Sequence, residues 1–400
     1  MPAFLETDYD LAIIGAGMSG LSLAAHLSEA AQRSSTALPK TIVIDPRTDY
    51  SADKTWCYWQ TEPTLFEPAI KNRWERWRVS ANGASHISEH PHMQYVRVDS
   101  GAYYQTARDL IAQSEQVHLR LGQTVQRVRD GSNQLSLGTS EQQYAVDFAL
   151  DTRPRAIPTD TLLQHFVGWE ITTESDCFDP GVVTLMDFMP SHGYDIHFFY
   201  VLPYGPRHAL VETTHFSMSL KTPEHYAHEI ETYLSRNLGL TRWQVVRREQ
   251  GIIPMAKHPR PARTDPASRI RNFGLHGDTV KPSSGYCYLQ AQRQAAAFSA
   301  NLQNEYWMHD SKPSHGQLAA AMPQPRNAIA RWFDGVFVNF LERQPQRAPE
   351  IFLALFSRVD PACLVRFLSD QAGPHDYLQV MTALPKTTFL REAADYARSA

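Results

Sequence analysis

A glycine-rich turn near the start of the chain constrains its fold more than any other feature. The segment GAGMSG carries Gly15, Gly17 and Gly20 and follows DLAII, residues 10–14. We expect DLAII to be a buried strand and the turn to open a helix, which leads to a second strand, TIVID, at 41–45. Strand, helix and strand in this order form the right-handed crossover of a dinucleotide-binding unit.

The spacing of the glycines suits a phosphate ligand. Because Gly15 and Gly17 lack Cβ atoms, a pyrophosphate could approach their backbone N–H groups, and the helix N-terminus adds a favourable partial charge. Gly20 would let the helix pack close to the strand. Asp45, at the end of the second strand, is placed to accept hydrogen bonds from a ribose hydroxyl. Strand, helix and acid together favour a dinucleotide site over an ordinary tight turn.

A second glycine-bearing segment favours FAD over NAD. Residues 273–286, FGLHGDTVKPSSGY, come late in the chain, where they could wrap the flavin end of the cofactor. We expect Asp278, with Gly277 beside it, to contact the ribityl or pyrophosphate region. The turn around Gly285 would bring backbone amides to the isoalloxazine. A loop joining two ordinary elements is the alternative interpretation.

Composition limits the classes of function. Hydrophobic residues make up 42% and charged residues 20% of the 400 residues, as in globular proteins, and the net charge of −4 argues against a nucleic-acid partner. The four cysteines are scattered without metal-ligand spacing, which predicts no metal site and a reduced, cytoplasmic protein. No apolar run reaches about 18 residues, so we expect no membrane-spanning helix, although the chain could lie on a membrane surface.

The predicted elements divide the chain into four parts. Residues 1–160 form the first part of an FAD-binding domain, with a helix expected over 97–115, and residues 161–255 form a β-rich substrate domain. Residues 256–305 return to the FAD-binding domain, and residues 306–400 form a helical region that either completes the core or contacts a membrane. The predicted fold class is α/β: an FAD-binding Rossmann-like domain of the glutathione-reductase or hydroxylase type, a β-sheet substrate domain and a helical C-terminal cap.

A series of motifs along nearly the whole chain resembles the flavoprotein lycopene β-cyclases of bacteria and plants. The motifs are YDLAIIGAGMSGLSLA, DKTWCYW, RVDSGAYY, LDTR, QHFVGWE, LMDF, HALVETTH, EQGIIP, GLHG, PSSGY, FLALF and RFL. Many flavoproteins share the glycine turn, whereas GWE, LMDF, VETTH and EQGIIP in this order are far more discriminating.

This resemblance implies an isomerase that closes the acyclic ends of lycopene into β-rings, giving γ-carotene and β-carotene. The family uses reduced FAD without net oxidation of the substrate, and NADPH or NADH is needed only to keep the flavin reduced. A carboxylic acid protonates the terminal double bond, the neighbouring alkene attacks the resulting cation, and loss of a ring proton completes the ring. Water must be excluded because it would trap the cation.

Glu212, in the apolar run HALVETTHF, is the candidate acid. An unpaired carboxylate is costly in such a run, so we expect its pKa to rise, as a general acid at neutral pH requires. The resemblance places the family's strand carboxylate at Glu212, with Thr213 where many relatives have a second acid. A water-facing or Arg-paired Glu212 is the alternative. Asp187, in LMDF, is predicted to support or orient the acid, with a structural hydrogen-bonding role as its alternative.

Other side chains are weaker candidates. His197 and His215 could act as a base, although strand histidines more often serve packing. Trp56, Trp59 and Trp169 could line a polyene tunnel or contact the flavin, although core packing is the more frequent use of tryptophan.

The substrate implied by the resemblance bears on localisation. Because a long hydrocarbon resides in the membrane, we expect a cytoplasmic protein peripherally associated with the inner membrane surface through its C-terminal helices. Two rival functions stay open at this stage. One is an FAD-dependent monooxygenase that consumes NAD(P)H and oxygen, and the other is a non-catalytic flavoprotein that binds carotenoid.

Overall fold

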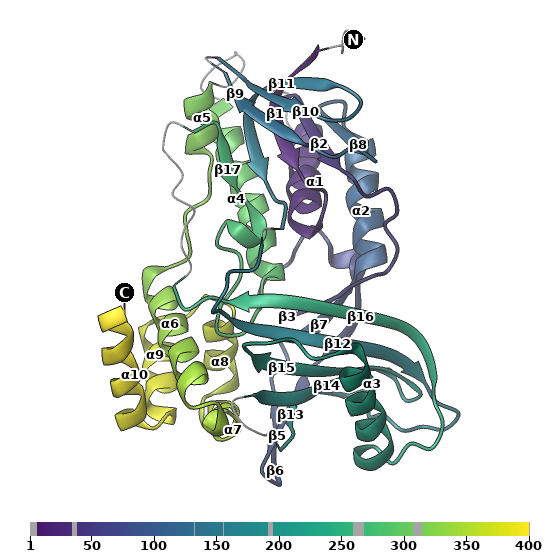
Figure 1. Ribbon diagram of the computed structural model, residues 1–400, viewed down its shortest axis with the longest axis vertical. Helices are drawn as coiled ribbons and strands as arrows, with labels where there is room; N and C mark the ends of the chain where they lie inside the picture. Colours follow the sequence, from purple (N-terminus) through teal and green to yellow (C-terminus); the bar gives the residue numbers. More distant parts are fainter. Residues whose placement is uncertain are drawn as a thin grey trace.

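The protein stacks an α/β unit on a second sheet, with C-terminal helices beside that sheet (Figure 1). In the described residues, no helix is both long enough and apolar enough to cross a bilayer. The computed structural model describes residues 6–33, 38–131, 133–154, 156–190, 195–258, 268–306 and 314–399.

The α/β unit is built on a seven-stranded sheet of order β8-β2-β1-β11-β10-β9, with β17 beside β11. The strands around β1 run parallel, and β9 and β10 add an antiparallel edge. Leu11 to Ile14 are almost fully buried, because a central parallel strand is covered on both faces. The strands are β1 Glu6–Ile14, β2 Thr41–Asp45, β8 Val117–Leu121, β9 Arg127–Asp130, β10 Leu135–Gly138, β11 Gln143–Asp151 and β17 Ile270–Asn272.

Helices from distant parts of the chain pack on this sheet. The oxygen of Gln292 in α4 accepts a 2.7 Å hydrogen bond from the hydroxyl of Ser22 in α1. The helix predicted over 97–115 is shorter than expected, because residues up to Asp99 pair as a strand and the Asp99 carboxylate caps the helix by accepting from Ala102 N at 2.9 Å. The helices are α1 Met18–Arg33, α2 Ser100–Ala112, α4 Tyr288–Tyr306 and α5 His315–Ala320.

The second sheet also has seven strands, in the order β16-β12-β15-β14-β13-β5-β6. Neighbours are antiparallel except β13 and β5, which run parallel. Strands β5 and β6 come from within residues 1–160, the range that we assigned to the FAD-binding domain. The strands are β5 Arg76–Ala81, β6 Ala84–Glu89, β12 Leu162–Thr172, β13 Val182–Phe188, β14 Ile196–Gly205, β15 His208–Ser217 and β16 Gln244–Met255.

A small sheet of order β3-β7-β4 contributes to the cores of both units. Trp59 and Tyr95 belong to the core of the second sheet, whereas Tyr58 and Val96 belong to the core of the α/β unit. Because successive residues of a strand point to opposite faces, one short strand pair serves two cores. The strands are β3 Thr55–Trp59, β4 Ile70–Trp74 and β7 Tyr95–Asp99.

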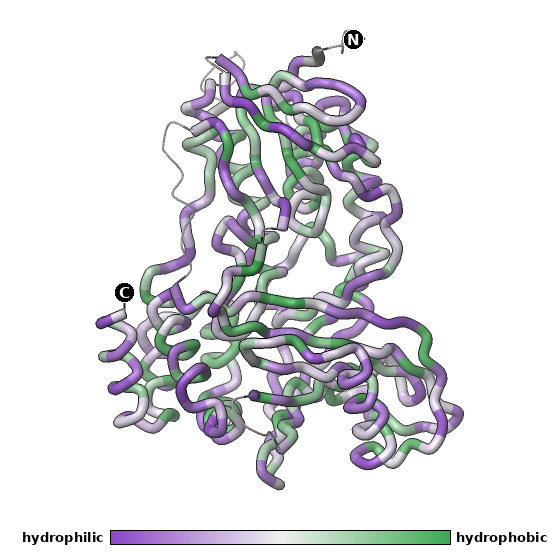
Figure 2. Tube along the Cα trace, viewed as in Figure 1, coloured by the Kyte–Doolittle hydropathy of each residue, from purple (hydrophilic) through white to green (hydrophobic). Residues whose placement is uncertain are grey.

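The two faces of the second sheet have different covers. Helix α3, Pro223–Thr232, and the π-turn Tyr233–Asn237 cover one face, and the small sheet and C-terminal helices share an apolar core with the other. Figure 2 shows hydrophobic segments running through the strands of both sheets. The C-terminal helices are α6 Ala328–Arg343, α7 Ala348–Arg358, α8 Pro361–Leu368, α9 Pro374–Ala383 and α10 Lys386–Ser399.

A buried cluster of four charges joins the C-terminal helices to the segment after β17. Lys281 Nζ lies 2.7 Å from Asp334 Oδ1 and 3.1 Å from Asp370 Oδ1, and Arg326 pairs with the same two aspartates. Two positive and two negative charges compensate one another, so the cluster can be buried without an unpaired ion.

We predict that Gly335→Ala destabilises the C-terminal helices. A Cβ at Gly335 would lie 2.2 Å from Cζ of Tyr396, so the buried Tyr396 ring or the two helices α6 and α10 must shift. Overpacking of this kind costs about 1–3 kcal/mol, which urea unfolding would measure. Gly316→Ala in α5 is the control, since its nearest contact would be Ser314 Oγ at 3.8 Å. Equal stability of the Gly335 variant and wild type would contradict the prediction.

Candidate functional site

Two glycines of the predicted turn have steric reasons to be glycine. Gly15 has φ of +104°, and a Cβ there would lie 2.6 Å from Thr152 Oγ1. A Cβ at Gly20 would lie 2.0 Å from the Gly15 carbonyl oxygen. The start of α1 therefore packs against the end of β1 at a distance that only a missing side chain allows.

Gly17 faces open space. A Cβ at this position would meet no protein atom within 4 Å among the described residues, and Gly17 is exposed at the N-terminal end of α1. Asp45 braces the turn, because its carboxylate accepts hydrogen bonds from Ala16 N at 2.6 Å and Arg47 N at 2.7 Å. The open approach to a helix N-terminus is the geometry that phosphate groups occupy in dinucleotide folds.

The structure brings the second glycine-bearing segment to this turn. Gly274 has φ of +70°, and a Cβ there would lie 2.5 Å from Cβ of Ser19, at the start of α1. Gly277 is tightly packed against Phe273, and the carbonyl of Gly277 accepts a 2.6 Å hydrogen bond from Gln294 Nε2. The segment therefore lies beside the helix start that the glycine turn opens.

Two further residues of this segment, Asp278 and Gly285, also have positive φ angles. Asp278 adopts φ of +69°, and its carboxylate accepts a 2.9 Å hydrogen bond from Arg326 N. Gly285, with φ of +73°, would place a Cβ 2.4 Å from Gln164 Oε1 of β12. That oxygen is buried and has no hydrogen-bond partner in the described part of the chain. The close approach of the Gly285 backbone and the unpaired oxygen of Gln164, which can accept a hydrogen bond, both fit a cofactor bound at this junction.

Glu212 lies in a row of residues across the second sheet. The register pairs Gly168 of β12 with Glu212 of β15 on one side and with Glu249 of β16 on the other. A Cβ at Gly168 would lie 3.4 Å from Glu212 Oε2 and 3.2 Å from Glu249 Cγ. Directly paired residues point to the same face of a sheet, so both glutamates extend over the gap that this glycine leaves.

Glu249 is held by partners that Glu212 lacks. Its Oε2 accepts hydrogen bonds from Arg247 Nη1 at 2.6 Å and Thr55 Oγ1 at 2.8 Å. Glu212 Oε1 accepts a hydrogen bond from Thr214 Oγ1 at 3.1 Å. The motif EQGIIP begins with Glu249, but the motif alone does not indicate that this glutamate lies beside Glu212. Pairing of the three strands around Gly168 would have identified it.

The surroundings of Glu212 favour its protonated form for a physical reason. Burial raises the pKa of Glu212 well above its ordinary value, the charge of Glu249 raises it further, and Thr214 and Arg247 oppose these effects only in part. Glu212 is thus an acid with a raised pKa beside a carboxylate that is ion-paired with Arg247. Such a pair can donate one proton and take one back.

Asp187 does not join this pair. It pairs with Phe199 in β14, and Phe199 in turn pairs with Thr213, so Asp187 lies on the face opposite Glu212. There its Oδ2 accepts a 2.7 Å hydrogen bond from the Tyr233 hydroxyl. The predicted support of the acid is corrected accordingly: a β-bulge in β13 and strand alternation direct Asp187 to the α3 face, where it has the structural role given as its alternative.

The other candidates are also divided between the faces. His197 and His215 pair with each other on the α3 face, away from Glu212. Trp169 pairs with Val211 and belongs to the α3-side core, whereas Trp59 belongs to the core on the Glu212 side. The two histidines therefore cannot serve Glu212 directly.

Trp56 packs against the core of the α/β unit and lies on neither face of the second sheet. It stacks on Tyr288 with ring centroids 5.8 Å apart, within the α/β unit. Of the three tryptophans proposed for the substrate or the flavin, Trp59 is therefore the one whose core lies on the acid's side of the second sheet.

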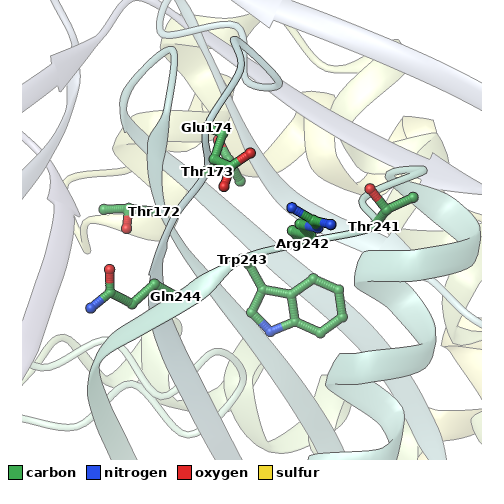
Figure 3. A pocket seen from close by; sticks show the side chains of 7 residues that line it. All are labelled: Thr172, Thr173, Glu174, Thr241, Arg242, Trp243 and Gln244. Atoms are coloured by element: carbon green, nitrogen blue, oxygen red, sulfur yellow. The ribbon is translucent and has the colours of Figure 1, made fainter.

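A surface hollow at the far end of the second sheet is separate from these groups. Figure 3 shows its lining at the end of β12 and before β16, where Trp243 and Arg242 are prominent, and its volume is about 640 Å³. None of the predicted site residues lines it. Its lining residues are Thr172, Thr173, Glu174, Thr241, Arg242, Trp243 and Gln244.

Comparison with known proteins identifies the family. A family profile described as "Lycopene cyclase protein" matches residues 10–394. The chain belongs to the lycopene cyclase protein family. A lycopene beta-cyclase from Paracoccus sp. (strain N81106 / MBIC 01143) is 29% identical over 261 residues, which cover 63% of this chain and 64% of that protein. The resemblance drawn from the motifs is therefore confirmed.

Solved structures with the same fold include one complexed with FAD. A geranylgeranyl bacteriochlorophyll reductase-like protein from Thermoplasma acidophilum has a TM-score of 0.67 at 12% identity, covering 98% of this chain and all of that one. The p-nitrophenol 4-monooxygenase PnpA from Pseudomonas putida has a TM-score of 0.61 at 12% identity, covering 96% and 99%. A variant of HpxO from Klebsiella pneumoniae, complexed with FAD, has a TM-score of 0.62 at 11% identity, covering 92% and 100%. The predicted fold class is confirmed.

We predict that Glu212→Gln makes this lycopene cyclase family member more stable than wild type at alkaline pH. Above about pH 4.3 the carboxyl ionises in the unfolded chain but stays protonated in the fold, so wild type loses stability as pH rises toward the raised pKa. The slope reaches about 1.4 kcal/mol per pH unit. Urea unfolding at several pH values would measure it. A stability difference that does not change with pH would contradict a raised pKa.

Proposed function

We propose that this protein is a lycopene β-cyclase, an isomerase that closes the acyclic ends of lycopene into β-rings. The observation that carries the proposal is Glu212, a buried carboxyl with a raised pKa, beside Glu249 in a row on the apolar side of the second sheet. A general acid with a raised pKa is what protonation of an alkene at neutral pH requires. The Paracoccus relative, named a lycopene beta-cyclase, supports the same reaction.

Each ring closure uses one proton from the protein and returns one proton to it. Glu212 donates its proton to the terminal double bond, and the neighbouring alkene attacks the tertiary cation to form the ring. A carboxylate of the Glu212–Glu249 pair then accepts a ring proton, which leaves the pair in its starting charge state. Arg247 and Thr55 hold Glu249 in place during this exchange, because both donate to its Oε2.

The surroundings of the pair keep water away from a cation. Tyr200 pairs with Glu212 in the register, and both Tyr200 and Trp59 belong to the large apolar core on that face. Aromatic faces also stabilise positive charge. The apolar cover thus serves two needs of carbocation chemistry: it excludes a nucleophile and offers electron-rich surfaces.

We propose FAD as the cofactor, held by the glycine turn, Asp45 and the segment from Gly274 to Gly285. In its reduced form FAD supplies an electron-rich neighbour that stabilises a carbocation through space, and NADPH or NADH would keep it reduced. Gly17 leaves room for the pyrophosphate, and Gly285 with Gln164 brings this chain's backbone and an unpaired acceptor to the junction with the second sheet.

We propose that the protein takes its hydrocarbon substrate from the cytoplasmic surface of the inner membrane. Two pairs of exposed apolar side chains lie one helical turn apart on the C-terminal helices, Ile329 with Trp332 on α6 and Leu378 with Met381 on α9. The rings of Phe333 and Tyr377 are 4.8 Å apart, so the two helices are close there. Such side chains can insert into the headgroup region of a bilayer.

Expression in a lycopene-accumulating host tests the reaction. We expect wild type to convert lycopene to γ-carotene and β-carotene, and Glu212→Gln to abolish conversion while flavin stays bound, because an amide cannot donate the proton. Chromatography of the pigments and the flavin absorbance of the purified protein give the two readouts. Unchanged lycopene with well-folded, flavin-loaded wild type would refute the proposal. Oxygen and NADPH consumed in step with product would favour a monooxygenase.

The Gly17→Val variant tests the cofactor site. A Cβ at this position would meet no protein atom within 4 Å in the described part of the chain, so we expect the fold to persist while FAD affinity falls at least about tenfold, since the methyl groups would occupy the space proposed for the pyrophosphate. Flavin fluorescence titration measures affinity, and circular dichroism checks the fold. Gly205→Val, which also faces open space, is the matched control. Equal FAD affinity of the two variants would exclude the turn as the phosphate site.

A further inference from the structure

The α3 face of the second sheet carries a cluster of imidazoles and a carboxylate that ring closure does not use. His197 of β14 and His215 of β15 are directly paired, and their rings stack with centroids 4.2 Å apart and planes 4° apart. Glu229 of α3 reaches both of them. These side chains come from three elements, so no spacing along the sequence reveals the cluster.

The distances between the possible ligand atoms of this cluster are close to the distances between ligand atoms around a bound metal ion. His215 Nε2 lies 3.0 Å and His197 Nε2 lies 3.7 Å from Glu229 Oε2, and one ligand atom from each of the three residues lies within 4.8 Å of the others. Tetrahedral Zn²⁺ with bonds of about 2.0–2.1 Å spaces its ligand atoms by roughly 3.4 Å. To bind one ion, the two parallel rings must rotate out of their stack so that both Nε2 atoms point at it.

The chemistry of the donor set suits a divalent transition metal. Imidazole nitrogens and a carboxylate are common Zn²⁺ ligands, and the hydroxyl of Thr213 steadies the carboxylate by donating to its Oε2 at 2.8 Å.

A fourth side chain is within reach. His225, one turn before Glu229 on α3, places Nε2 2.9 Å from Glu229 Oε1. Its side chain is 51% exposed, whereas those of His197, His215 and Glu229 are 12%, 3% and 14% exposed. His225 therefore marks the side from which an ion can enter.

We propose that His197, His215 and Glu229 form a binding site for a divalent transition-metal ion of the Zn²⁺ class, with His225 as the fourth side chain. The ion would fasten α3 to β14 and β15 on the face opposite Glu212. It would act on structure, not on the proton transfers, because no ligand lies on the acid's face. The proposal is therefore independent of the reaction assigned to the protein.

Zn²⁺ binding to the metal-stripped full-length protein tests the site. We expect calorimetric titration with ZnCl₂ to show one saturable site per chain and a rise in the thermal unfolding temperature. In His197→Ala and Glu229→Gln, we expect Kd to increase at least about tenfold, because each loses a ligand. Circular dichroism of each variant without metal shows whether it is folded.

Two controls separate this site from other histidines. The exposed pair His90 and His92, with ring centroids 6.2 Å apart, could also hold an ion, so we expect the double variant His90→Ala/His92→Ala to keep wild-type affinity. His208→Ala removes an imidazole that pairs with Glu170 on the same sheet, and it should also leave Zn²⁺ affinity unchanged. Absence of saturable binding to wild type would overturn the proposal, as would loss of binding only in the His90/His92 variant.

Discussion

The contact between helix α1 and the end of strand β1 is the constraint on which the rest of the structure depends. Gly20 lies so close to the Gly15 carbonyl that no Cβ fits between them. This contact sets the start of α1, where Ser19 packs on Gly274 of the returning segment. The same segment reaches Gln164 of the second sheet through Gly285. A series of close contacts at glycines thus joins the glycine turn to the sheet that carries Glu212.

Strand alternation separates two kinds of chemistry within the second sheet. Glu212 faces the apolar core under the C-terminal helices, where burial raises the pKa of its carboxyl. Thr213, the next residue, points to the opposite face and donates to Glu229 among the histidines. One strand can therefore present an acid to a water-poor side and a polar network to α3, because successive side chains point to opposite faces.

Local patterns in the sequence predicted the fold class correctly and pointed to the residues of the candidate site. The glycines, the flanking strands and the apolar run around Glu212 are local signals, and they led to the fold class and to a buried acid. The role of Asp187 was misjudged because its face depends on a β-bulge and on pairing with β14. Glu249 was overlooked because it meets Glu212 only across Gly168 of a third strand.

The sequence by itself determined the glycine turn, the family and the apolar setting of Glu212, since these rest on residues adjacent in the chain and on periods of two and 3.6 residues. Only the tertiary structure decided which polar groups meet. Register and strand order placed Glu249 beside Glu212, directed Asp187 and the histidines to the other face, and gathered His197, His215 and Glu229. Long-range pairing is set by how distant segments bury their apolar faces together, and no single segment records that outcome.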